Sequence, residues 1–481
     1  MSADTQNPAQ AASSTPANPT ANLRNDGGIA TVSDILAQRF GPRFDTGKSQ
    51  REQHAHTTTW LPSQAPDGVV FPQDVDEVRE IVRICADHRV PIVPFGAGTS
   101  LEGHVNAPLG GISVDMRDMD RVLEVNAEDM DCRVQPGVTR KALNTHLRDT
   151  GLFFPIDPGA DASLGGMAST RASGTNAVRY GTMKDVVLAL QAVMPSGEVV
   201  RTARRARKTS AGYDLTRLMV GSEGTLGLIT ELTLRLTGIP EAMSSAVCSF
   251  PSVEAACDAV IATFQFGLPM ARIELMDAMS VRAVNAYSGL SLPQTPLLLL
   301  EFHGSEAGVA EQAATFGEVA RDHGSTAFEW TTDPAERTRL WQARHDAYWA
   351  IRALRPDSDA LATDVCVPLS RLAEAVTRSQ QECERIGLTG PVLGHVGDGN
   401  FHVTLMIARE DEAERAKARE YLSWLAELAI SMEGTCTGEH GIGQGKRAYL
   451  EAELGAGAVN MMRAIKTAVD PLNIMNPGKI L

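Results

Sequence analysis

The sequence has few cysteines, no long apolar run and no excess of basic residues. Its seven cysteines are scattered and form no C-x-x-C pair, which excludes a disulfide framework or zinc-finger pattern and favours a reducing compartment. No apolar run approaches the roughly 18 residues of a membrane-spanning helix. The formal net charge of −15 argues against nucleic acid or an anionic membrane as the main partner, because both require a basic surface.

The N-terminal stretch is rich in Ala, Ser, Thr, Pro and Asn, and Arg24 is its one basic residue. It lacks the apolar core of a secretory signal and the several arginines of a mitochondrial transit peptide. We therefore expect residues 1–30 to form a disordered tail, with periodic structure from about Thr31. The expected location is cytoplasmic, with peripheral membrane attachment left open. A length of 481 residues favours two domains with accessory segments.

Short elements alternate with glycine-rich turns up to a domain boundary near Gly238. In this half we expect helices after Asp74 and at 139–148, a hairpin joining 185–194 to 198–201, and strands at 92–95, 112–116, 122–125, 132–135 and 228–236. Beyond the boundary we expect helices at 252–266, 305–322, 334–353, 369–386 and 411–432 and strands at 271–276, 297–303 and 400–407. This order indicates an α+β fold with an antiparallel sheet covered by helices, and the closing segment 471–479 has the composition of an ordered turn.

The first of three glycine-rich segments, residues 94–103, follows a strand. Gly96 and Gly98 let the backbone approach an anion closely, and two hydroxyl side chains follow them. A Rossmann fingerprint requires its third glycine at position 101, which is Leu101, and a helix after it. We therefore exclude a Rossmann loop and favour another kind of diphosphate loop.

Two further glycine-rich segments lie at 157–174 and 221–227. The longer one consists almost entirely of small residues, which pack no core but can wrap a ligand with many backbone N–H donors. Tight turns in a β-rich domain are the alternative interpretation. Three such segments within about 130 residues favour a dinucleotide site.

These segments, with Pro158-Gly159, Gly165-Gly166 and Gly221-Ser-Glu-Gly224, resemble the PCMH-type FAD-binding domain of the vanillyl-alcohol-oxidase superfamily. The resemblance implies two α/β subdomains at 60–240, a substrate or cap domain at 241–440 and a segment at 441–481 that returns to the FAD domain. It implies that FAD contacts Pro94, Gly96, Ala97, Gly98, Thr99, Ser100, Pro158, Gly159, Ser163, Gly165, Gly166, Ser169, Ser173, Gly174, Glu223, Gly227, Ile229 and Asn476. Some members attach the flavin to a histidine of the first loop, but that position is Gly98 here, so we expect non-covalent FAD.

A second group of chemically active residues lies in the C-terminal half. If Asp398 and Gly399 are the central residues of a hairpin turn, His395 and His402 lie directly opposite one another. Glu439 and His440 lie in a glycine-flanked loop, where side chains project into clefts. Two histidines and a carboxylate form a typical open site for Zn²⁺ or Mn²⁺. Two surface histidines and an unrelated acidic loop are the alternative.

Arg344, Tyr348 and Arg352 recur at a spacing of four residues on one helix face. This pattern predicts either a solvated cationic stripe or an arginine that recognises a carboxylate.

These motifs, with Asn473-Ile-Met-Asn-Pro-Gly-Lys479, resemble the flavin-dependent D-2-hydroxyacid dehydrogenases over nearly all of 60–481. The resemblance implies that His395, His402 and Glu439 bind the metal, that His440 is the general base and that Arg344 binds the substrate carboxylate. Relatives that prefer dicarboxylates carry a lysine near the stretch 362–365, which lacks it here. The missing lysine weakens D-2-hydroxyglutarate and favours a short substrate such as D-lactate. A D-2-hydroxyglutarate or glycolate dehydrogenase of the same fold is the alternative.

Other functions stay open on the sequence alone. A metal-dependent hydrolase with structural glycine loops would be colourless, and a non-catalytic flavoprotein subunit would be yellow but not reduced by any hydroxyacid. For the leading hypothesis we expect a small 2-hydroxyacid substrate and a cytochrome or quinone as electron acceptor. A homodimer is left open.

Overall fold

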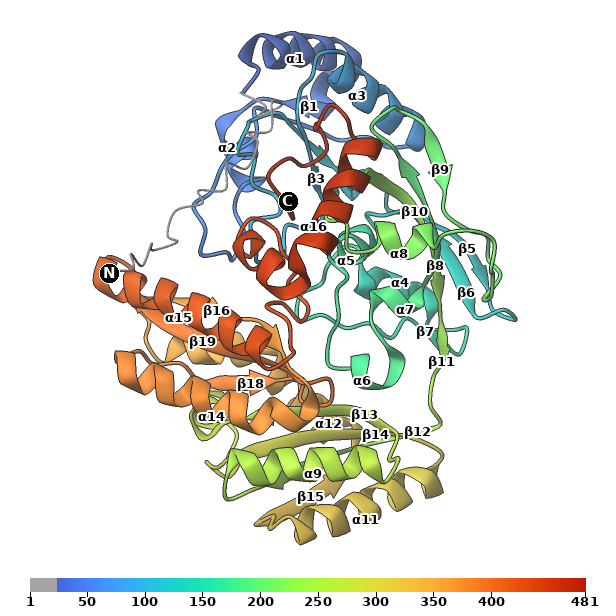
Figure 1. Ribbon diagram of the computed structural model, residues 1–481. Helices are drawn as coiled ribbons and strands as arrows, with labels where there is room; N and C mark the ends of the chain where they lie inside the picture. Colours follow the sequence, from blue (N-terminus) through green and yellow to red (C-terminus); the bar gives the residue numbers. More distant parts are fainter. Residues whose placement is uncertain (1–23) are drawn as a thin grey trace, which may run out of the picture.

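Three large β-sheets organise residues 24–481, the part of the chain that this computed structural model describes (Figure 1). The first sheet has the order β1-β2-β4-β3, with β1 (Phe44–Asp45), β2 (Gly68–Val70), β3 (Ile92–Phe95) and β4 (Ile112–Asp115). Strands β2, β3 and β4 are parallel, whereas β1 runs antiparallel to β2. Its helices are α1 (Asp26–Phe40), α2 (Lys48–Gln53) and α3 (Val75–Asp87), with the short 3₁₀ turns η1 (Gly41–Arg43) and η2 (Met116–Asp118).

Helix α1 corrects the predicted tail. Asn25 caps the helix by accepting a hydrogen bond from the Gly28 N–H at 3.0 Å, and Ile29 is buried. Residues 26–30 are therefore helical, because an N-cap and an apolar face outweigh the polar composition around them. The predicted tail upstream of residue 24 lies outside the described residues.

The second sheet is antiparallel, with the order β5-β6-β10-β8-β9. Its strands are β5 (Val122–Asn126), β6 (Asp131–Val134), β8 (Val187–Val193), β9 (Val199–Arg201) and β10 (Leu228–Arg235). The helices of this region are α4 (Arg140–Leu147), α5 (Leu164–Thr170), α6 (Ala177–Tyr180), α7 (Met183–Val186) and α8 (Leu215–Met219). A two-stranded ribbon of β7 (Leu152–Phe153) and β11 (Thr237–Gly238) leads to the third sheet.

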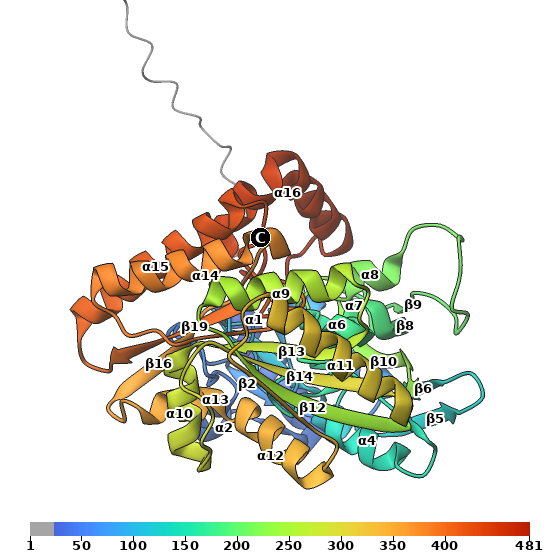
Figure 2. The ribbon, with the colours of Figure 1, turned by 90° about the horizontal axis from the view of Figure 1, so that it is seen from below.

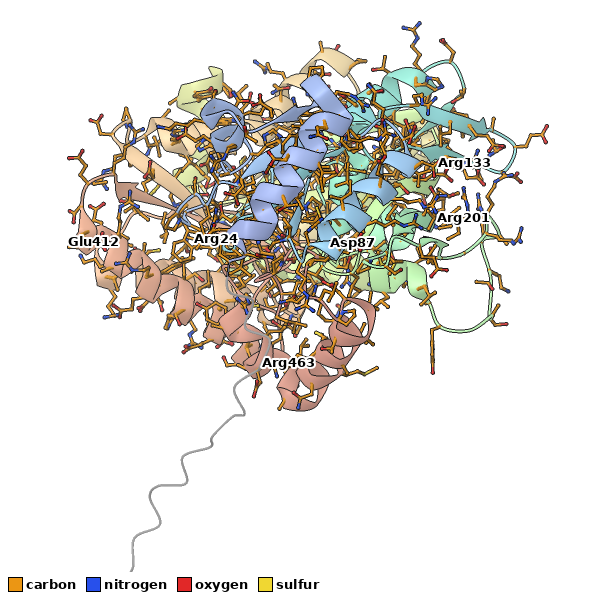
Figure 3. The ribbon with its side chains drawn as sticks, turned by 90° about the horizontal axis from the view of Figure 1, so that it is seen from above. Arg24, Asp87, Arg133, Arg201, Glu412 and Arg463 are labelled. Carbon is orange, nitrogen blue, oxygen red and sulfur yellow. The ribbon has the colours of Figure 1, made fainter. Side chains whose placement is uncertain are left out.

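The structure corrects one sequence prediction in this region. Part of the long glycine-rich segment, predicted as a loop, forms helix α5, since its small residues allow close packing against Pro136. Strand β10 forms as predicted and is buried on both faces up to its last residue, although polar and apolar residues alternate along its second half. Arg133 and Arg201, labelled in Figure 3, cover its polar face, with nitrogens 3.6 and 2.8 Å from Glu231 Oε1.

The third sheet is also antiparallel, with the order β15-β12-β14-β13-β18-β19-β16 and with β17 paired to β19. Its strands are β12 (Ala242–Ser249), β13 (Met270–Met276), β14 (Leu297–Gly304), β15 (Ala327–Thr331), β16 (Ser358–Ala362), β17 (Val365–Cys366), β18 (Val392–Gly394) and β19 (Asn400–Ala408). Helices α9 (Val253–Gln265), α11 (Glu306–Asp322), α14 (Leu369–Ile386) and α15 (Glu412–Ser431) cover one face. Helices α10 (Ala278–Ser288), α12 (Pro334–His345) and α13 (Ala347–Ala353) cover the other, as Figure 2 shows.

Strand β14 shows how the sheet serves two cores. Leu298, Leu300 and Phe302 belong to the core on the α9 side, whereas Leu297 and Leu299 pack on the α10 side. Alternate residues of a strand point to opposite faces, so a continuous apolar run builds a strand that is covered on both sides. The prediction of an antiparallel sheet covered by helices is confirmed.

The chain returns to the first two sheets after α15. The turn η3 (Arg447–Tyr449) leads into α16 (Leu450–Val469), which is interrupted at Gly455, and Ile465 and Val469 pack against the core of the second sheet. Met475 then pairs in parallel with Ile92 of β3. None of the helices in residues 24–481 combines the length and the apolar composition that crossing a membrane requires.

Candidate active site

A cavity of about 670 Å³ is lined by residues from all three large sheets, among them residues of strands β3, β10 and β19. It brings together the two groups of residues that the sequence singled out. The residues implied as FAD contacts line it except Gly174, and so do His395, His402, Glu439, His440 and Arg344. A Cβ on Gly174 would lie 2.5 Å from the Asp157 backbone, so this glycine serves close packing within its own loop.

The glycine-rich loops leave polar groups without partners on their side of the cavity. The hydroxyls of Ser100 and Ser163 are buried and have no hydrogen-bond partner within residues 24–481. A Cβ on Gly96 would lie 2.3 Å from Ser163 Oγ, so the two loops can approach only because position 96 has no side chain. Buried hydroxyls normally have a partner, and a diphosphate would supply acceptor oxygens here. The loops therefore fit the dinucleotide that the sequence predicted.

We expect Gly165→Ala to weaken this side of the cavity. The added Cβ would lie 2.4 Å from Pro136 Cβ and 3.0 Å from the Pro136 carbonyl oxygen, neither of which moves freely. Overpacking of this kind costs roughly 1–3 kcal/mol, so the free energy of unfolding and the FAD content after purification should both fall. Urea denaturation and the flavin-to-protein absorbance ratio measure the two effects. Gly238→Ala, whose Cβ would meet no atom within 4 Å, is the control, and equal behaviour of both variants would contradict the expectation.

The two histidines lie side by side, but not in the predicted register. His402 pairs with Leu393 rather than with His395, because β18 ends at Gly394 and residues 395–399 form a wider connection than a two-residue turn. The ring centroids are nevertheless 5.4 Å apart. Glu439 approaches both rings, with its Oε1 3.3 Å from His395 Nε2 and 3.5 Å from His402 Nε2.

The other nitrogen of each histidine already has a fixed partner. His395 Nδ1 lies 2.7 Å from Glu274 Oε1, and His402 Nδ1 lies 2.8 Å from the Thr363 carbonyl oxygen. Acceptors at Nδ1 place the ring proton there and leave Nε2 as a lone-pair donor, which is how proteins orient metal-binding histidines. With Glu439, the two Nε2 atoms form a set whose ligand atoms lie within 4.8 Å of one another. This donor set fits a divalent cation such as Zn²⁺ or Mn²⁺.

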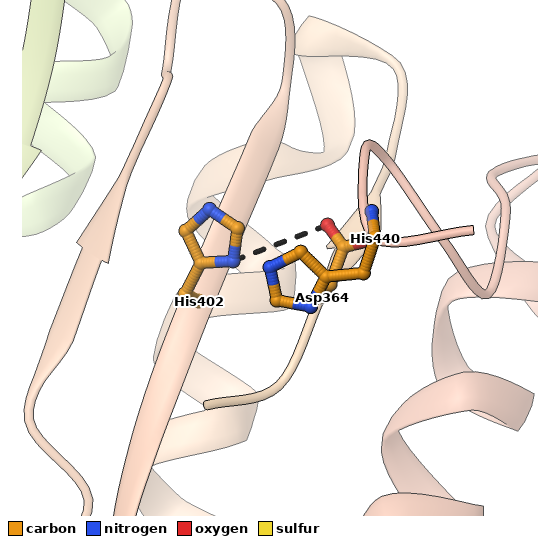
Figure 4. Close-up of side chains that lie close together, drawn as sticks. All are labelled: Asp364, His402 and His440. Atoms are coloured by element: carbon orange, nitrogen blue, oxygen red, sulfur yellow. Dashed lines mark hydrogen bonds and ion pairs between the residues drawn. The ribbon is translucent and has the colours of Figure 1, made fainter. Parts of the chain in front are cut away.

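Asp364, His402 and His440 form a second group of the same size (Figure 4). Asp364 Oδ1 is 3.9 Å from His402 Nδ1, but Oδ2 already accepts hydrogen bonds from the backbone N–H groups of Glu439 and His440. His402 Nδ1 is likewise occupied by the Thr363 carbonyl. A cation at this position would have to displace these bonds, so the group with Glu439 is the better metal site.

His440 is placed and charged as a general base requires. Its ring stacks on that of His402, with centroids 5.3 Å apart, and its Nδ1 is 4.0 Å from Glu102 Oε1. Within residues 24–481, its buried Nδ1 makes no hydrogen bond, and the residue lines the cavity. Burial lowers the pKa of His440 to about 4, although Asp364 opposes the shift. The imidazole is therefore neutral near pH 7 and able to accept a proton.

Arg344 lies on the same side of the cavity as the histidines. Its guanidinium donates to Glu274 Oε2 at 2.6 Å, and its buried Nε has no hydrogen-bond partner within residues 24–481. Glu274 thus joins Arg344 to His395. Burial works against its charge, but His395 and Arg344 together hold the pKa of the Glu274 carboxyl below its usual value. The unpartnered Nε is available to a carboxylate in the cavity.

The prediction that Arg344, Tyr348 and Arg352 share one face of a single helix is wrong in part. The expected helix 334–353 is two helices, because Asp346 adopts φ −81° and ψ −1° and ends α12. Arg344 and Tyr348 line the cavity, whereas Arg352 lies over the ring of Trp349 and not in the lining.

Sequence reasoning missed Glu274 and Asp364, which orient the site without lining the cavity. Glu274 stands in the apolar strand β13 and is 1% exposed, and Asp364 is also 1% exposed. A charged residue inside an apolar strand was the available signal, since carboxylates are almost never fully buried without a partner. For Asp364, which lies between β16 and the two-residue strand β17, the sequence carries no such signal.

Known proteins match the chain along most of its length. Residues 66–203 match the family described as "FAD binding domain", and residues 239–480 match "FAD linked oxidases, C-terminal domain". The chain is 52% identical over 453 residues to the probable D-lactate dehydrogenase, mitochondrial, of Danio rerio, covering 94% of this chain and 91% of the relative. It is 47% identical over 450 residues to the D-lactate dehydrogenase (cytochrome), mitochondrial, of Arabidopsis thaliana, covering 94% and 78%. The structure of p-cresol methylhydroxylase with substrate bound has the same fold, with a TM-score of 0.79 at 16% identity over 94% of this chain and 97% of that one.

Proposed function

The chain belongs to the FAD-linked oxidases, and we propose that it oxidises D-lactate to pyruvate at the cavity described above. The membership confirms the predicted fold class, an α+β protein with a PCMH-type FAD-binding half. It also confirms that the chain is an FAD-dependent 2-hydroxyacid dehydrogenase. One observation supports the proposal above all: the His395, His402 and Glu439 set lies beside His440 in the same cavity as the glycine-rich loops.

The lining of the cavity favours a short monocarboxylate. Arg344 is the one Lys or Arg side chain among the described lining residues, so one substrate carboxylate has a cationic partner and a second would have none. The wall near the histidines includes Leu361, Ala362 and Leu393, which suit a small apolar substituent such as the methyl group of lactate. D-2-hydroxyglutarate would need a second cation there, and glycolate would leave this wall without a contact.

The residues of the chain have distinct tasks in this reaction. Arg344 holds the carboxylate of the substrate, and Nε2 of His440 accepts the proton of the C2 hydroxyl. When bound, FAD supplies the acceptor of the hydride that leaves C2. Loss of the hydroxyl proton and the C2 hydride converts lactate to pyruvate.

We also propose that His395, His402 and Glu439 hold a divalent cation. When bound there, the cation would lower the pKa of the substrate hydroxyl and assist its deprotonation. The pKa of the Glu439 carboxyl lies below its usual value, because the two histidines outweigh the effect of burial, so the ligand is charged at neutral pH.

Spectroscopy of the purified protein tests the proposed reaction. We expect a flavin absorbance band that D-lactate bleaches under anaerobic conditions and that L-lactate leaves unchanged. Glycolate and D-2-hydroxyglutarate are tested in the same screen. If either acid bleaches the flavin band faster than D-lactate does, that acid is the substrate. A folded protein without a flavin band would contradict the reaction as a whole.

Removal of the cation should stop turnover without removing FAD. We expect dialysis against a strong chelator to lower kcat/KM for D-lactate by about 100-fold or more, since a Lewis acid in this position contributes several kcal/mol. Added Zn²⁺ or Mn²⁺ should restore the rate, and elemental analysis identifies the native ion. Glu439→Gln should already be slow and respond little to the chelator. Full activity of protein shown to be metal-free would refute the metal site.

We propose a cytochrome or a quinone as the acceptor of electrons from the reduced enzyme. The name of the Arabidopsis relative includes a cytochrome, and a net charge of −15 suits association with a basic cytochrome. Both relatives are named as mitochondrial proteins, whereas the sequence predicted a cytoplasmic location for this chain. That location and a homodimer stay predictions.

A further inference from the structure

The loop between α15 and α16 carries Glu439 and His440 but contains little regular structure. Five of its residues between positions 434 and 446 are glycines. Glycine leaves the backbone free to adopt many conformations. Groups outside this catalytic loop, defined here as residues 434–446, must therefore hold the two side chains in place.

Asp364 binds the loop from the third sheet. Its Oδ2 accepts hydrogen bonds from the backbone N–H groups of Glu439 at 3.0 Å and His440 at 2.9 Å. The same oxygen accepts the Thr437 hydroxyl at 2.8 Å, and Oδ1 accepts the side-chain amide of Asn400 at 2.8 Å. Asp364 therefore fixes the backbone at the two residues whose side chains reach the cavity.

Glu223 binds the same loop from the half of the chain that carries the glycine-rich segments. Its Oε1 accepts the N–H of Ile442 at 2.7 Å, and its Oε2 accepts the N–H of Gly443 at 2.8 Å. Glu223 is 5% exposed and precedes β10. Both oxygens thus contact the backbone two and three residues beyond His440, from a position more than 200 residues earlier in the chain.

The glycines of the loop allow both carboxylates to come this close. A Cβ on Gly438 would lie 2.1 Å from Asn400 Nδ2 and 3.0 Å from Asp364 Oδ1. On Gly441, at φ +83°, it would lie 2.7 Å from Glu223 Oε1. The glycine pattern that marks the loop in the sequence therefore matches the approach of the two acids.

The basic side chains near the two acids lie farther from the carboxylate oxygens than the backbone amides of the loop do. Lys446 Nζ is 3.6 Å from Asp364 Oδ2, and His104 Nε2 is 3.3 Å from Glu223 Oε2. A buried carboxylate must be hydrogen-bonded to be stable, and each acid takes two backbone amides of the loop. The acids and the loop thus stabilise each other.

We propose that Asp364 and Glu223 are positioning residues that hold the catalytic loop from the two halves of the molecule. Asp364 sets the direction of the Glu439 and His440 side chains, and Glu223 fixes the loop relative to the glycine-rich half, where the cofactor binds. The inference rests on the proposed function, because it takes Glu439 as a metal ligand and His440 as the base.

Two isosteric variants, Asp364→Asn and Glu223→Gln, test the proposal. Each keeps one oxygen acceptor and turns the other into an N–H donor that faces backbone N–H groups. Asp277→Asn is the matched control, since Asp277 is 6% exposed and accepts the Ser280 N–H at 2.8 Å at the start of α10. We expect hydrogen exchange of peptides within 434–446 to accelerate at least tenfold in both variants and to stay unchanged in the control. This readout requires neither substrate nor turnover.

Kinetics and metal binding show whether the effect reaches the reaction. Loss of groups that orient metal ligands typically lowers affinity or activity about 10–100-fold, and we expect that range for kcat and for metal affinity in both variants. Because both acids hold one loop, the double variant should lose less than the product of the two single losses. Unchanged loop exchange, or wild-type kcat in both variants, would overturn the proposal. A wild-type enzyme that D-lactate does not reduce would instead overturn the proposed function, while the exchange experiment would still decide the role of the two acids.

Discussion

His440→Asn should lower the rate at which D-lactate reduces the flavin by about 10²–10⁴-fold, the usual contribution of a general base. The enzyme should keep its FAD, because the loop 434–446 is fixed through backbone N–H groups rather than through the His440 side chain. Stopped-flow absorbance under anaerobic conditions measures the rate, and the flavin-to-protein ratio measures the cofactor.

The structural reason for so large an effect is the isolation of His440. Within residues 24–481, the buried Nδ1 of His440 makes no hydrogen bond, and Thr363 and Glu274 turn the neighbouring histidines so that their Nε2 atoms face Glu439. Among the described residues, no second base is therefore in position to replace it. His146→Asn, an exposed histidine on α4, is the control and should reduce normally. A His440→Asn enzyme within threefold of wild type would remove this residue from the mechanism.

Arg344→Met should lower kcat/KM for D-lactate by about 100-fold or more, corresponding to roughly 3 kcal/mol for a lost charge-assisted pair. The change removes the cation for the substrate carboxylate and leaves Glu274, at 1% exposure, with His395 as its remaining close partner. Steady-state kinetics with D-lactate measure the loss, and most of it should appear in KM if metal content is retained.

Two companion variants separate the contributions of Arg344. Arg344→Lys keeps a charge near Glu274 but loses the planar fork, so it should retain the metal and still bind D-lactate poorly. Arg352→Met removes the cation on α13 that lies over Trp349 outside the cavity and should change kcat/KM by less than twofold. Equal losses in the Arg344 and Arg352 variants would mean that a general cationic field, not Arg344, attracts the substrate.

The local patterns of the sequence were enough to predict much of the fold. The capping pattern at Asp74, the apolar run of β14 and the hairpin from β8 to β9 depend on neighbours a few residues away, and the structure contains all three elements. Helix α16 was not predicted, because most of its residues are exposed and Gly455 interrupts its pattern. Its position depends on contacts with the second sheet, which sequence periodicity does not encode.

The site residues divide in the same way: short sequence patterns reveal some of them, whereas others act through contacts with distant parts of the chain. His395, His402, Glu439 and His440 stood out because histidines and acids in glycine-rich loops are unusual over short stretches. Their relative register could not be predicted, since the length of the connection at 395–399 is decided by packing around the strand end. Asp364 and Glu223 act through backbone amides far along the chain, and no local pattern reveals such a partner.

The pairing of Met475 with Ile92 has a consequence for synthesis on the ribosome. The β3 backbone carbonyl of Ile92 accepts the N–H of Asn476, and the N–H of Ile92 donates to the carbonyl of Ile474. The edge of the first sheet thus stays open until residues 474–476 have left the exit tunnel, after the whole third sheet has been made. Nascent chains should therefore expose this strand edge without its partner until the last residues of the chain are made, which is the interval in which an unpaired edge can pair wrongly.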